Sequence, residues 1–464
     1  MENGLRDKSV LVVGAGESGL AAARLLEALS AQVTIVDQKE PEELAAAKEM
    51  APKSVEWLFG EQPDQIYQNT DLVVVSPGVA YDHPGLVAAR DVGRPVIGEM
   101  ELAFRFQKLP IIAITGSNGK TTSTSLVGHI LTKSTKESPF IGGNIGNPLA
   151  NLAYDFVNEN LISYKWAVIE VSSFQLETVD LFKANAAAFL NLTPDHLDRH
   201  GDMAEYFRAK CRIFQRQTSQ DLSVINEDDP LLAIKRVSGR RFGFSRLKRP
   251  GFGGYVAKVG EEEVLYLVDG SKILAEAPWS AFQLTGVHNQ ENVLAAVGLT
   301  LAAGVKPDKA LEVAKDFAPG DHRLKFVAEI NGVRYYDDSK GTNVGAVARA
   351  LDSFPESVIL IAGGRGKGLD FSYLWPWVKR KVNGLVLIGE SREKMRQALG
   401  GAARSCMANS MEDAVIKASE LASPGEIVLL SPACASFDMF KNYKERGEAF
   451  VQAVKNLTKK RKKK

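Results

Sequence analysis

The chain has little cysteine, no long apolar run and no excess of charge of either sign. Its 464 residues include only three cysteines, Cys211, Cys406 and Cys434, which lie far apart and without metal-ligand spacing. Neither a disulfide framework nor a zinc site is therefore expected, and a reducing cytoplasm fits. The 57 Lys and Arg residues nearly balance 56 Asp and Glu residues. This balance gives no reason to expect nucleic acid or a membrane surface as a main partner.

Apolar stretches are too short to cross a bilayer. The longest, residues 293–305, is interrupted by glycines and falls short of the roughly 20 residues that a spanning helix needs. We interpret it as a buried core helix. The first apolar stretch leads into a glycine motif rather than a cleavage site, so no signal peptide is expected. We expect a cytoplasmic monomer without membrane insertion.

The length predicts roughly three domains, and each third of the chain alternates short β-branched runs with helical patterns. Such alternation favours parallel sheets covered by helices, so the predicted class is α/β. We place the domains at residues 1–100, 101–319 and 320–464. Strands are expected at 10–13, 33–36, 72–75, 111–114, 166–171, 186–192, 358–361, 385–388 and 427–430. Short glycine-punctuated strands at 251–273 predict hairpins attached to the central domain, and the basic tail 459–464 is predicted to be disordered.

The first glycine motif runs from Gly14 to Gly19 as Gly-Ala-Gly-Glu-Ser-Gly, after a predicted strand and before a helix, and Asp37 ends the next strand. This is the dinucleotide fingerprint in its proper context, with a tight turn and a helix N-terminus for phosphates. The glycines could also serve only the turn. A diphosphate ligand other than NAD is equally compatible, because the loop recognises phosphates rather than nicotinamide.

A more specific motif, Thr-Gly-Ser-Asn-Gly-Lys-Thr-Thr at 115–122, directly follows the buried strand 111–114. Its backbone N–H groups are expected to cradle phosphates, with Lys120 neutralising β and γ charge and Thr121 reaching Mg²⁺. Ile114 stands where the common phosphate-loop pattern has glycine. This shorter loop points away from GTPase switches.

Acidic and imidazole side chains follow the next two central strands. Glu170 lies near the end of the strand 166–171, where a carboxylate faces the ligand crevice of an α/β sheet, and position alone leaves metal binding and a structural role equally open. His196 follows the strand 186–192 between Asp195 and Asp198. A lone histidine is more often structural, but two flanking aspartates at a strand end favour a role in a site.

The phosphate loop, the segment that begins at Glu170 and residues 195–200, together with residues 286–292 and Asp321-His322-Arg323, resemble the Mur ligases, which are three-domain ATP-dependent amide ligases. Three segments, 172–177, 338–343 and 431–438, look like the members that add D-glutamate to UDP-N-acetylmuramoyl-L-alanine in peptidoglycan precursor synthesis. The resemblance implies a Rossmann-like UDP-binding first domain, a central ATPase-like domain and a Rossmann-like C-terminal domain. It implies that ATP phosphorylates the alanyl carboxylate and that the amine of D-glutamate attacks the acyl phosphate through a tetrahedral intermediate.

The resemblance also implies roles for individual residues. Catalysis would fall to Lys120, His196, Lys210 and Lys340. ATP would be bound by Gly116, Ser117, Asn118, Gly119, Lys120, Thr121, Thr122, Asn289, Asn292, Arg323 and Asp338. The UDP substrate would contact Gly14, Gly16, Ser18, Gly19, Asp37, Ser76 and Asn144. D-glutamate would meet His196, Thr342, Lys367, Ser436, Phe437 and Tyr443. Two Mg²⁺ ions would be held by Thr121, Glu170, His196 and Lys210, the last as a carbamate.

Two of these residues also have a structural interpretation. Lys210 taken alone is interpreted as a solvated helix lysine, and Asn292 could instead satisfy backbone groups of the helix that follows. Three rival functions also stay open. The first is another ligase of this family, adding a different amino acid or acting on folates, against which the three segments argue. The second is an NAD-dependent oxidoreductase, which leaves the Lys120 loop unused. The third is a nucleotide-gated binding module, which has no need of Glu170 and His196.

Overall fold

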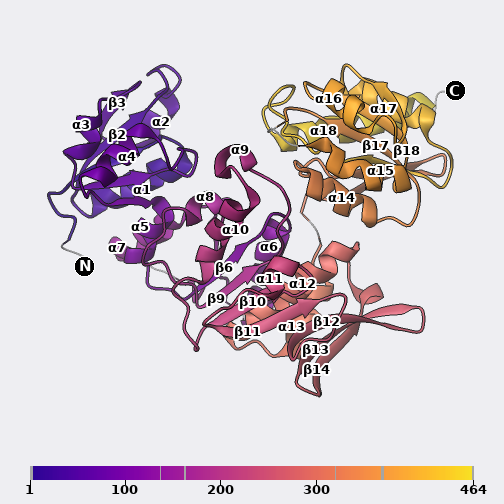
Figure 1. Cartoon of the computed structure of the whole chain (residues 1–464), viewed down its shortest axis with the longest axis horizontal. Helices are drawn as coiled ribbons and strands as arrows, with labels where there is room; N and C mark the ends of the chain where they lie inside the picture. Colours follow the sequence, from indigo (N-terminus) through magenta and orange to yellow (C-terminus); the bar gives the residue numbers. More distant parts are fainter. Residues whose placement is uncertain (1–3, 136, 161–162, 319, 367–369, 462–464) are drawn as a thin grey trace.

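The computed structural model describes residues 4–135, 137–160, 163–318, 320–366 and 370–461, so Pro319 at the predicted domain boundary lies outside it. It contains three sheets, each the centre of one α/β domain. Figure 1 shows the first and third domains on different sides of the central one. The α/β class and the three-domain organisation are thus confirmed. Within the described ranges, no helix combines the length and the apolar character needed to span a bilayer.

The first domain is built on five parallel strands in the order β3-β2-β1-β4-β5. The strands are β1 (Ser9–Val13), β2 (Gln32–Asp37), β3 (Glu56–Phe59), β4 (Leu72–Val75) and β5 (Val96–Gly98). The helices are α1 (Glu17–Ala28), α2 (Ala45–Met50), α3 (Asp64–Gln68), α4 (Pro84–Asp91) and α5 (Glu99–Phe106). Strands β1 and β4 are apolar and buried over almost their whole length, as central parallel strands require.

The central domain has nine strands in the order β14-β13-β12-β11-β10-β9-β6-β8-β7. They are β6 (Ile111–Thr115), β7 (Phe140–Gly143), β8 (Ala167–Glu170), β9 (Ala186–Phe189), β10 (Leu222–Asn226), β11 (Arg240–Ser245), β12 (Phe252–Val259), β13 (Glu262–Asp269) and β14 (Lys272–Pro278). The last three pair antiparallel with one another, which confirms the predicted hairpins. The helices are α6 (Lys120–Thr135), α7 (Leu149–Val157), α8 (Ser173–Leu176), α9 (Leu197–His200), α10 (Met203–Cys211), α11 (Pro230–Ala233), α12 (Val287–Thr300) and α13 (Pro307–Lys315).

The C-terminal domain has six strands in the order β15-β16-β20-β17-β18-β19, of which only β15 and β16 pair antiparallel. The strands are β15 (Lys325–Ile330), β16 (Val333–Asp337), β17 (Val358–Gly363), β18 (Val382–Ile388), β19 (Arg404–Met407) and β20 (Ile427–Leu430). The helices are α14 (Val344–Asp352), α15 (Trp375–Lys381), α16 (Arg392–Leu399), α17 (Met411–Leu421) and α18 (Tyr443–Arg461).

Several predicted boundaries differ from the structure by a few residues, and two of these differences have a clear physical cause. Strand β9 ends at Phe189 rather than at residue 192, because Asn191 leaves the sheet and hydrogen-bonds the backbone of Asn118. The helix α18 continues to Arg461, so disorder from residue 459 is contradicted for 459–461, whereas 462–464 lie outside the described residues. Extending a helix that is already anchored costs little, because each added residue gains a hydrogen bond. The anchor is the apolar face of α18, where Phe450 and Val454 are buried.

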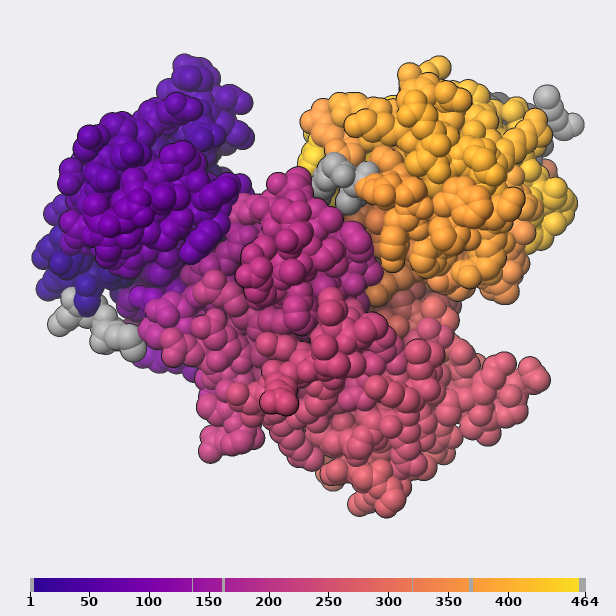
Figure 2. Space-filling model, viewed as in Figure 1, coloured from indigo at the N-terminus to yellow at the C-terminus, as the bar shows by residue number. Residues whose placement is uncertain are grey.

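The sheet order decides where the functional loops meet. Strand β6 lies between β9 and β8, and all three run parallel. Their carboxyl ends therefore share one edge of the sheet, which is where open α/β sheets bind ligands. Figure 2 shows the first and third domains standing apart from each other, with the central domain between and below them in this view.

Candidate active site

The phosphate loop joins β6 to α6 and is fixed mainly by side chains from the segment after β9. Asn191 accepts a hydrogen bond from the Asn118 N–H at 2.9 Å and donates to the Asn118 carbonyl at 3.0 Å. The Ser117 hydroxyl lies 2.9 Å from both the N–H and the carbonyl oxygen of Thr193. The ammonium group of Lys120 donates to the carbonyls of Gly116 and Ser117 at 2.8 and 3.0 Å. The loop thus has a fixed shape with its lysine folded over it.

Glu170, at the end of β8, is 2% exposed and lies beside the first turn of α6. Its Oε2 accepts from the Thr121 hydroxyl at 2.6 Å, and its Oε1 accepts from the Asn144 amide at 2.9 Å. The structure therefore brings the predicted metal residues Thr121 and Glu170 into direct contact. It also joins Asn144, predicted on the UDP substrate side, to the phosphate side of the site.

His196 precedes α9 in a left-handed backbone conformation, with φ of +54°. Left-handed backbone is uncommon for residues other than glycine, although histidine is among those that adopt it more often. The carboxylate of Asp195 accepts the His196 N–H at 3.0 Å and lies 3.6 Å from Nε2 of the same histidine. The ring of Phe174 packs edge-on against the imidazole at 4.8 Å between centroids. His196 is therefore clamped from two sides with its ring partly open.

Lys210, on α10, is buried at 1% exposure, so its reading as a solvated helix lysine is wrong. Its ammonium group donates to the Gly116 carbonyl at 3.0 Å and lies 4.7 Å from the centre of the Tyr206 ring. Burial, followed by the nearby charge of Lys120, lowers the pKa of Lys210 well below its ordinary value. Removal from water disfavours the ammonium form, so a neutral, nucleophilic amine becomes accessible.

A pocket between the central and C-terminal domains collects most of the residues predicted to bind ATP. Its walls include seven of them, Asn118, Gly119, Thr122, Asn289, Asn292, Arg323 and Asp338, with Lys340, His288 and Arg349 in addition. Asn292 lies inside α12, where its amide donates to Asn289 at 2.9 Å, so it does not cap this helix. The backbone of Gly119 approaches it so closely that a Cβ there would lie 2.3 Å from its Oδ1. Asn292 therefore bears directly on the phosphate loop.

The charged groups of this pocket are strongly affected by burial. Burial raises the pKa of Asp338 to about 7, against the opposing effects of its 2.7 Å hydrogen bond from Ser431 and of the Arg323 charge. Burial and the Arg323 charge lower the pKa of Lys340 to about 8. Burial also lowers the pKa of Arg323. Perturbed groups concentrated in a cleft are typical of functional sites.

The residues predicted to bind D-glutamate are only partly brought together. The ammonium group of Lys340 lies 3.9 Å from the centre of the Tyr443 ring, and Thr342 follows on the same segment. Ser436 is buried, whereas the side chain of Phe437 is 63% exposed. Lys367 lies outside the described residues. The assignment of this group remains a prediction.

A second pocket lies between the first domain and the central domain. It is lined by Gly14, Gly16, Ser18, Asp37, Ser76 and Asn144, all predicted to contact the UDP substrate. Gly19 does not line it, because its role is packing: a Cβ there would lie 1.9 Å from the Gly14 carbonyl oxygen. Asp37 accepts the Ala15 N–H at 2.8 Å and so fixes the glycine loop itself.

Two contacts between the central and C-terminal domains were not predicted from the sequence. Asn343 and Asp195 form a hydrogen bond between domains, and Arg349 lines the pocket between the central and C-terminal domains while pairing with Glu291 across the same interface at 3.9 Å. The only local signal was for Asn343, since asparagine directly before an apolar helical pattern is a frequent N-cap. Its partner lies 148 residues away.

Comparison with protein families gives matches along nearly the whole chain. Residues 8–98 match the Mur ligase MurD-like N-terminal domain, residues 114–300 the Mur ligase middle domain, and residues 322–434 the Mur ligase glutamate ligase domain. Curated relatives are UDP-N-acetylmuramoylalanine--D-glutamate ligases. Those of Geotalea uraniireducens and Acidobacterium capsulatum are each 43% identical, covering 98% and 97% of this chain and 98% and 96% of their own.

Solved structures with the same architecture are more distant in sequence. The UDP-N-acetylmuramate-alanine ligase MurC of Thermotoga maritima has a TM-score of 0.58 at 19% identity, covering 97% of this chain and 99% of its own. The MurF ligase of the same organism, in complex with ADP, has a TM-score of 0.61 at 15% identity, covering 99% and 97%. These likenesses concern the fold. The family-model matches and the relatives at 43% identity show that the chain belongs to the Mur ligase family.

Proposed function

We propose that this Mur ligase joins D-glutamate to the L-alanyl carboxylate of UDP-N-acetylmuramoyl-L-alanine at the expense of ATP. Near-full-length relatives at 43% identity carry that name. The single structural observation that carries the proposal is the pocket in which the phosphate-loop residues Asn118 and Gly119 face Asp338 and Lys340 of the C-terminal domain. Such a pocket can hold ATP between the central and C-terminal domains, while the C-terminal domain presents the amino acid and the first domain presents the UDP substrate.

The domain roles follow from the two pockets. We assign residues 1–100 to binding the UDP substrate, 101–319 to binding ATP and 320–464 to binding D-glutamate. We also propose that the reaction takes place in the cytoplasm. Asn144 lies at the junction, because it lines the UDP-side pocket and donates to Glu170. The alanyl carboxylate would therefore reach the phosphate loop near Glu170.

The proposed reaction has two steps. The γ-phosphoryl group of ATP passes to a carboxylate oxygen, giving ADP and an acyl phosphate, and the free amine of D-glutamate then attacks the acyl carbon. The resulting tetrahedral intermediate collapses, expelling phosphate and leaving an amide, while the amine loses a proton. Lys120 serves the first step by offsetting repulsion between two anions. Lys340 and Thr342 would hold the carboxylates of the incoming amino acid.

Divalent metal is expected near Glu170. The hard oxygen donors of Thr121 and Glu170 fit Mg²⁺, which takes few protein ligands beside phosphate and water, whereas the imidazole of His196 is a softer donor. Within the described residues no group of three or more His, Cys, Asp or Glu side chains forms a cage. Bound Mg²⁺ would supply charge neutralisation for the phosphates. We propose Thr121 and Glu170 at one ion, and Glu170 with His196 at a second.

Lys210 is proposed to carry a carbamate. Its buried, neutral amine would attack the carbon of CO₂, forming an N–C bond and releasing one proton, so that a cation becomes an anion facing the second ion. Its burial and its lowered pKa support this chemistry, because only the unprotonated amine reacts.

The test is phosphate release from ATP with UDP-N-acetylmuramoyl-L-alanine, comparing D-glutamate with L-glutamate, L-lysine and no amino acid. Turnover only with D-glutamate is expected. Turnover with another amino acid would keep the ligase mechanism but overturn the substrate assignment. No turnover under any condition would favour a nucleotide-gated binding module.

A further inference from the structure

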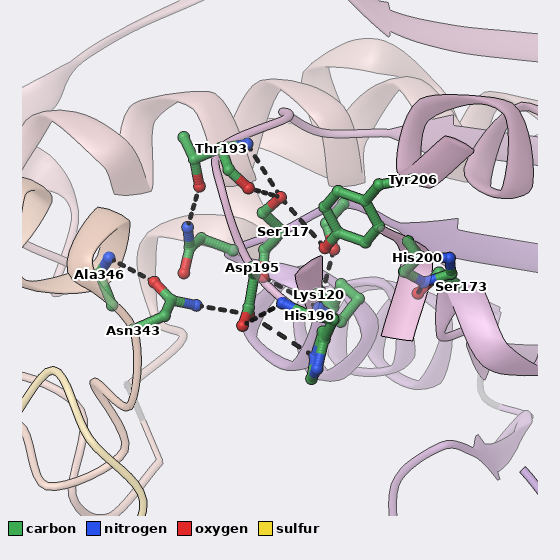
Figure 3. Close-up of polar contacts among 12 residues, drawn as sticks. Ser117, Lys120, Ser173, Thr193, Asp195, His196, His200, Tyr206, Asn343 and Ala346 are labelled. Carbon is green, nitrogen blue, oxygen red and sulfur yellow. Dashed lines mark hydrogen bonds and ion pairs between the residues drawn. The ribbon is translucent and has the colours of Figure 1, made fainter. Parts of the chain in front are cut away.

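The C-terminal domain is tied to the central domain by a hydrogen bond between two buried side chains. The Asn343 amide nitrogen lies 2.9 Å from Oδ2 of Asp195, and the two residues are 6% and 7% exposed. The amide oxygen of Asn343 accepts the Ala346 N–H at 2.8 Å and so caps α14. Figure 3 shows Asn343 pointing from the start of α14 toward Asp195. Each end of this amide therefore has a partner in a different domain.

The carboxylate of Asp195 serves both sides of the interface. While Oδ2 accepts from Asn343, Oδ1 accepts the N–H of His196 at 3.0 Å. This second bond supports the left-handed backbone of His196. The position of the C-terminal domain and the conformation of His196 thus depend on the same carboxylate.

Asn343 also ends the segment that carries the groups assigned to D-glutamate. Lys340 lies only three residues before it, a span of at most about 10 Å, and Thr342 is its neighbour. Gly341, between them, is packed so tightly that a Cβ would lie 2.5 Å from Oδ2 of Asp338. A segment this short and this confined cannot absorb a shift of Asn343, so Lys340 must move with it.

The turn after Asn343 packs against the phosphate loop. A Cβ on Gly345 would lie 2.6 Å from the Thr193 hydroxyl and 3.1 Å from the Asn118 amide nitrogen. That amide donates to the same hydroxyl at 3.1 Å. The start of α14 therefore touches the elements that hold ATP, and the Asn343 bond fixes its register there.

We propose that Asn343 is a positioning residue of the ligation, which through Asp195 holds the segment of Lys340 and Thr342 in register with His196. The inference rests on the proposed function and deepens it. It assigns Asn343 to the amide-forming step rather than to phosphorylation, because Asn343 fixes the amino-acid side of the site.

Asn343→Asp separates this role from simple helix capping. Aspartate caps a helix as well as asparagine does, and its charge suits a helix N-terminus. It nevertheless places one carboxylate against another, where an amide had donated to Asp195. Ser410→Asp is the matched control, because Ser410 caps α17 of the same domain from an exposed position.

Four quantities would be measured at saturating ATP: the melting temperature, acyl-phosphate formation without D-glutamate, and kcat and KM for D-glutamate. For Asn343→Asp, two carboxylates facing each other in a buried site should lower the melting temperature, and KM for D-glutamate should rise about tenfold or more, well beyond any loss of acyl-phosphate formation. Ser410→Asp should change none of them. Wild-type kinetics in Asn343→Asp, or an equal loss of acyl phosphate and ligation, would overturn the proposal.

Exchanging the two residues gives a second test. In Asp195→Asn/Asn343→Asp, the amide of residue 195 can donate to residue 343 and still accept the His196 N–H, so every hydrogen bond is conserved. The kcat/KM for D-glutamate of the double variant should match or exceed that of Asp195→Asn alone. If the losses of the two single variants simply add as free energies in the double variant, the proposal is overturned. A wild-type protein without D-glutamate-dependent turnover would instead refute the proposed function.

Discussion

The ammonium group of Lys210 lies 3.0 Å from the carbonyl oxygen of Gly116, the first glycine of the phosphate loop, although the two residues are 94 positions apart. A buried lysine at the back of a phosphate loop adds positive charge where Lys120 already stands. That repulsion contributes to the lowered pKa of Lys210, after burial itself. Conversion to a carbamate would remove the repulsion and supply an anion beside the metal region.

Lys210→Ala is therefore expected to lose ligase activity and to regain part of it when a short carboxylic acid such as acetate is added. The acid would occupy the space of the side chain and replace the carbamate. Lys210→Arg is the control, since arginine keeps the charge, cannot be carbamylated and leaves no cavity, so acetate should not help it. Activity is measured with and without acetate, and the carbamate by NMR in ¹³C-bicarbonate. Absence of both rescue and a carbamate signal would contradict the proposal.

Lys120→Ala should abolish acyl-phosphate formation while leaving affinity for the UDP substrate nearly intact. The lysine is folded over the phosphate loop, whereas the UDP-side pocket is lined by other residues. Removing a single donor that stabilises transition-state charge already costs about 10²- to 10³-fold in rate, and Lys120 carries a full charge, so the loss should leave no acyl phosphate to detect. Hydroxylamine trapping measures the acyl phosphate and calorimetry the UDP substrate. Lys133→Ala, at the exposed end of the same helix, should change neither quantity. Equal loss of acyl-phosphate formation and of UDP-substrate affinity in Lys120→Ala would argue against separate domains for the two ligands.

Features encoded locally were predictable from the sequence. Continuous β-branched or apolar residues followed by glycine predict the strand before Gly14 and the strand before Gly116. The structure has both strands at the expected places. Both glycines have positive φ, +97° and +154°, which is why the turns need them. Burial of β6 on both faces follows from the same pattern.

Features that depend on distant partners were not predictable. The spacing of residues in the sequence does not predict the burial of Lys210 under the phosphate loop or the hydrogen bond from Asn343 to Asp195. Both depend on how whole helices and strands pack against one another. The early end of β9 has the same cause: Asn191 serves the phosphate loop, although its apolar neighbours favour a longer strand. Tertiary contacts override local preference at such points.

The buried carboxylate of Glu99 should make stability depend on pH. Glu99 begins α5 and is 2% exposed; its Oε1 accepts the Ala150 N–H at 2.6 Å, and the described residues offer no partner to Oε2. Burial raises its pKa to about 7. The folded protein thus keeps a proton that the unfolded chain gives up near its ordinary pKa, so this contribution is present at acid pH and is lost as pH rises through about 7.

Glu99→Gln keeps the acceptor for Ala150 and removes the titration. The variant should melt close to wild type at pH 5 and above it at pH 8, with a gain of up to about 3 kcal/mol in the free energy of unfolding. Melting curves of both proteins at the two pH values measure the difference. A gain that is the same at both values would show that Glu99 does not titrate in this range.

Two glycines of the first domain should respond to alanine in different ways. At Gly19 a Cβ would lie 1.9 Å from the backbone oxygen of Gly14, so α1 could no longer pack against the loop. At Gly16 nothing lies within 4 Å of an added Cβ, φ is −74°, and the residue lines the UDP-side pocket. Gly19→Ala should therefore lower the melting temperature and Gly16→Ala should not.

Gly16→Ala should instead weaken UDP substrate binding about tenfold or more, because the methyl group would stand where a diphosphate approaches the backbone. Calorimetry on the folded Gly16→Ala protein decides the point: unchanged affinity would mean that the diphosphate does not approach the loop at Gly16.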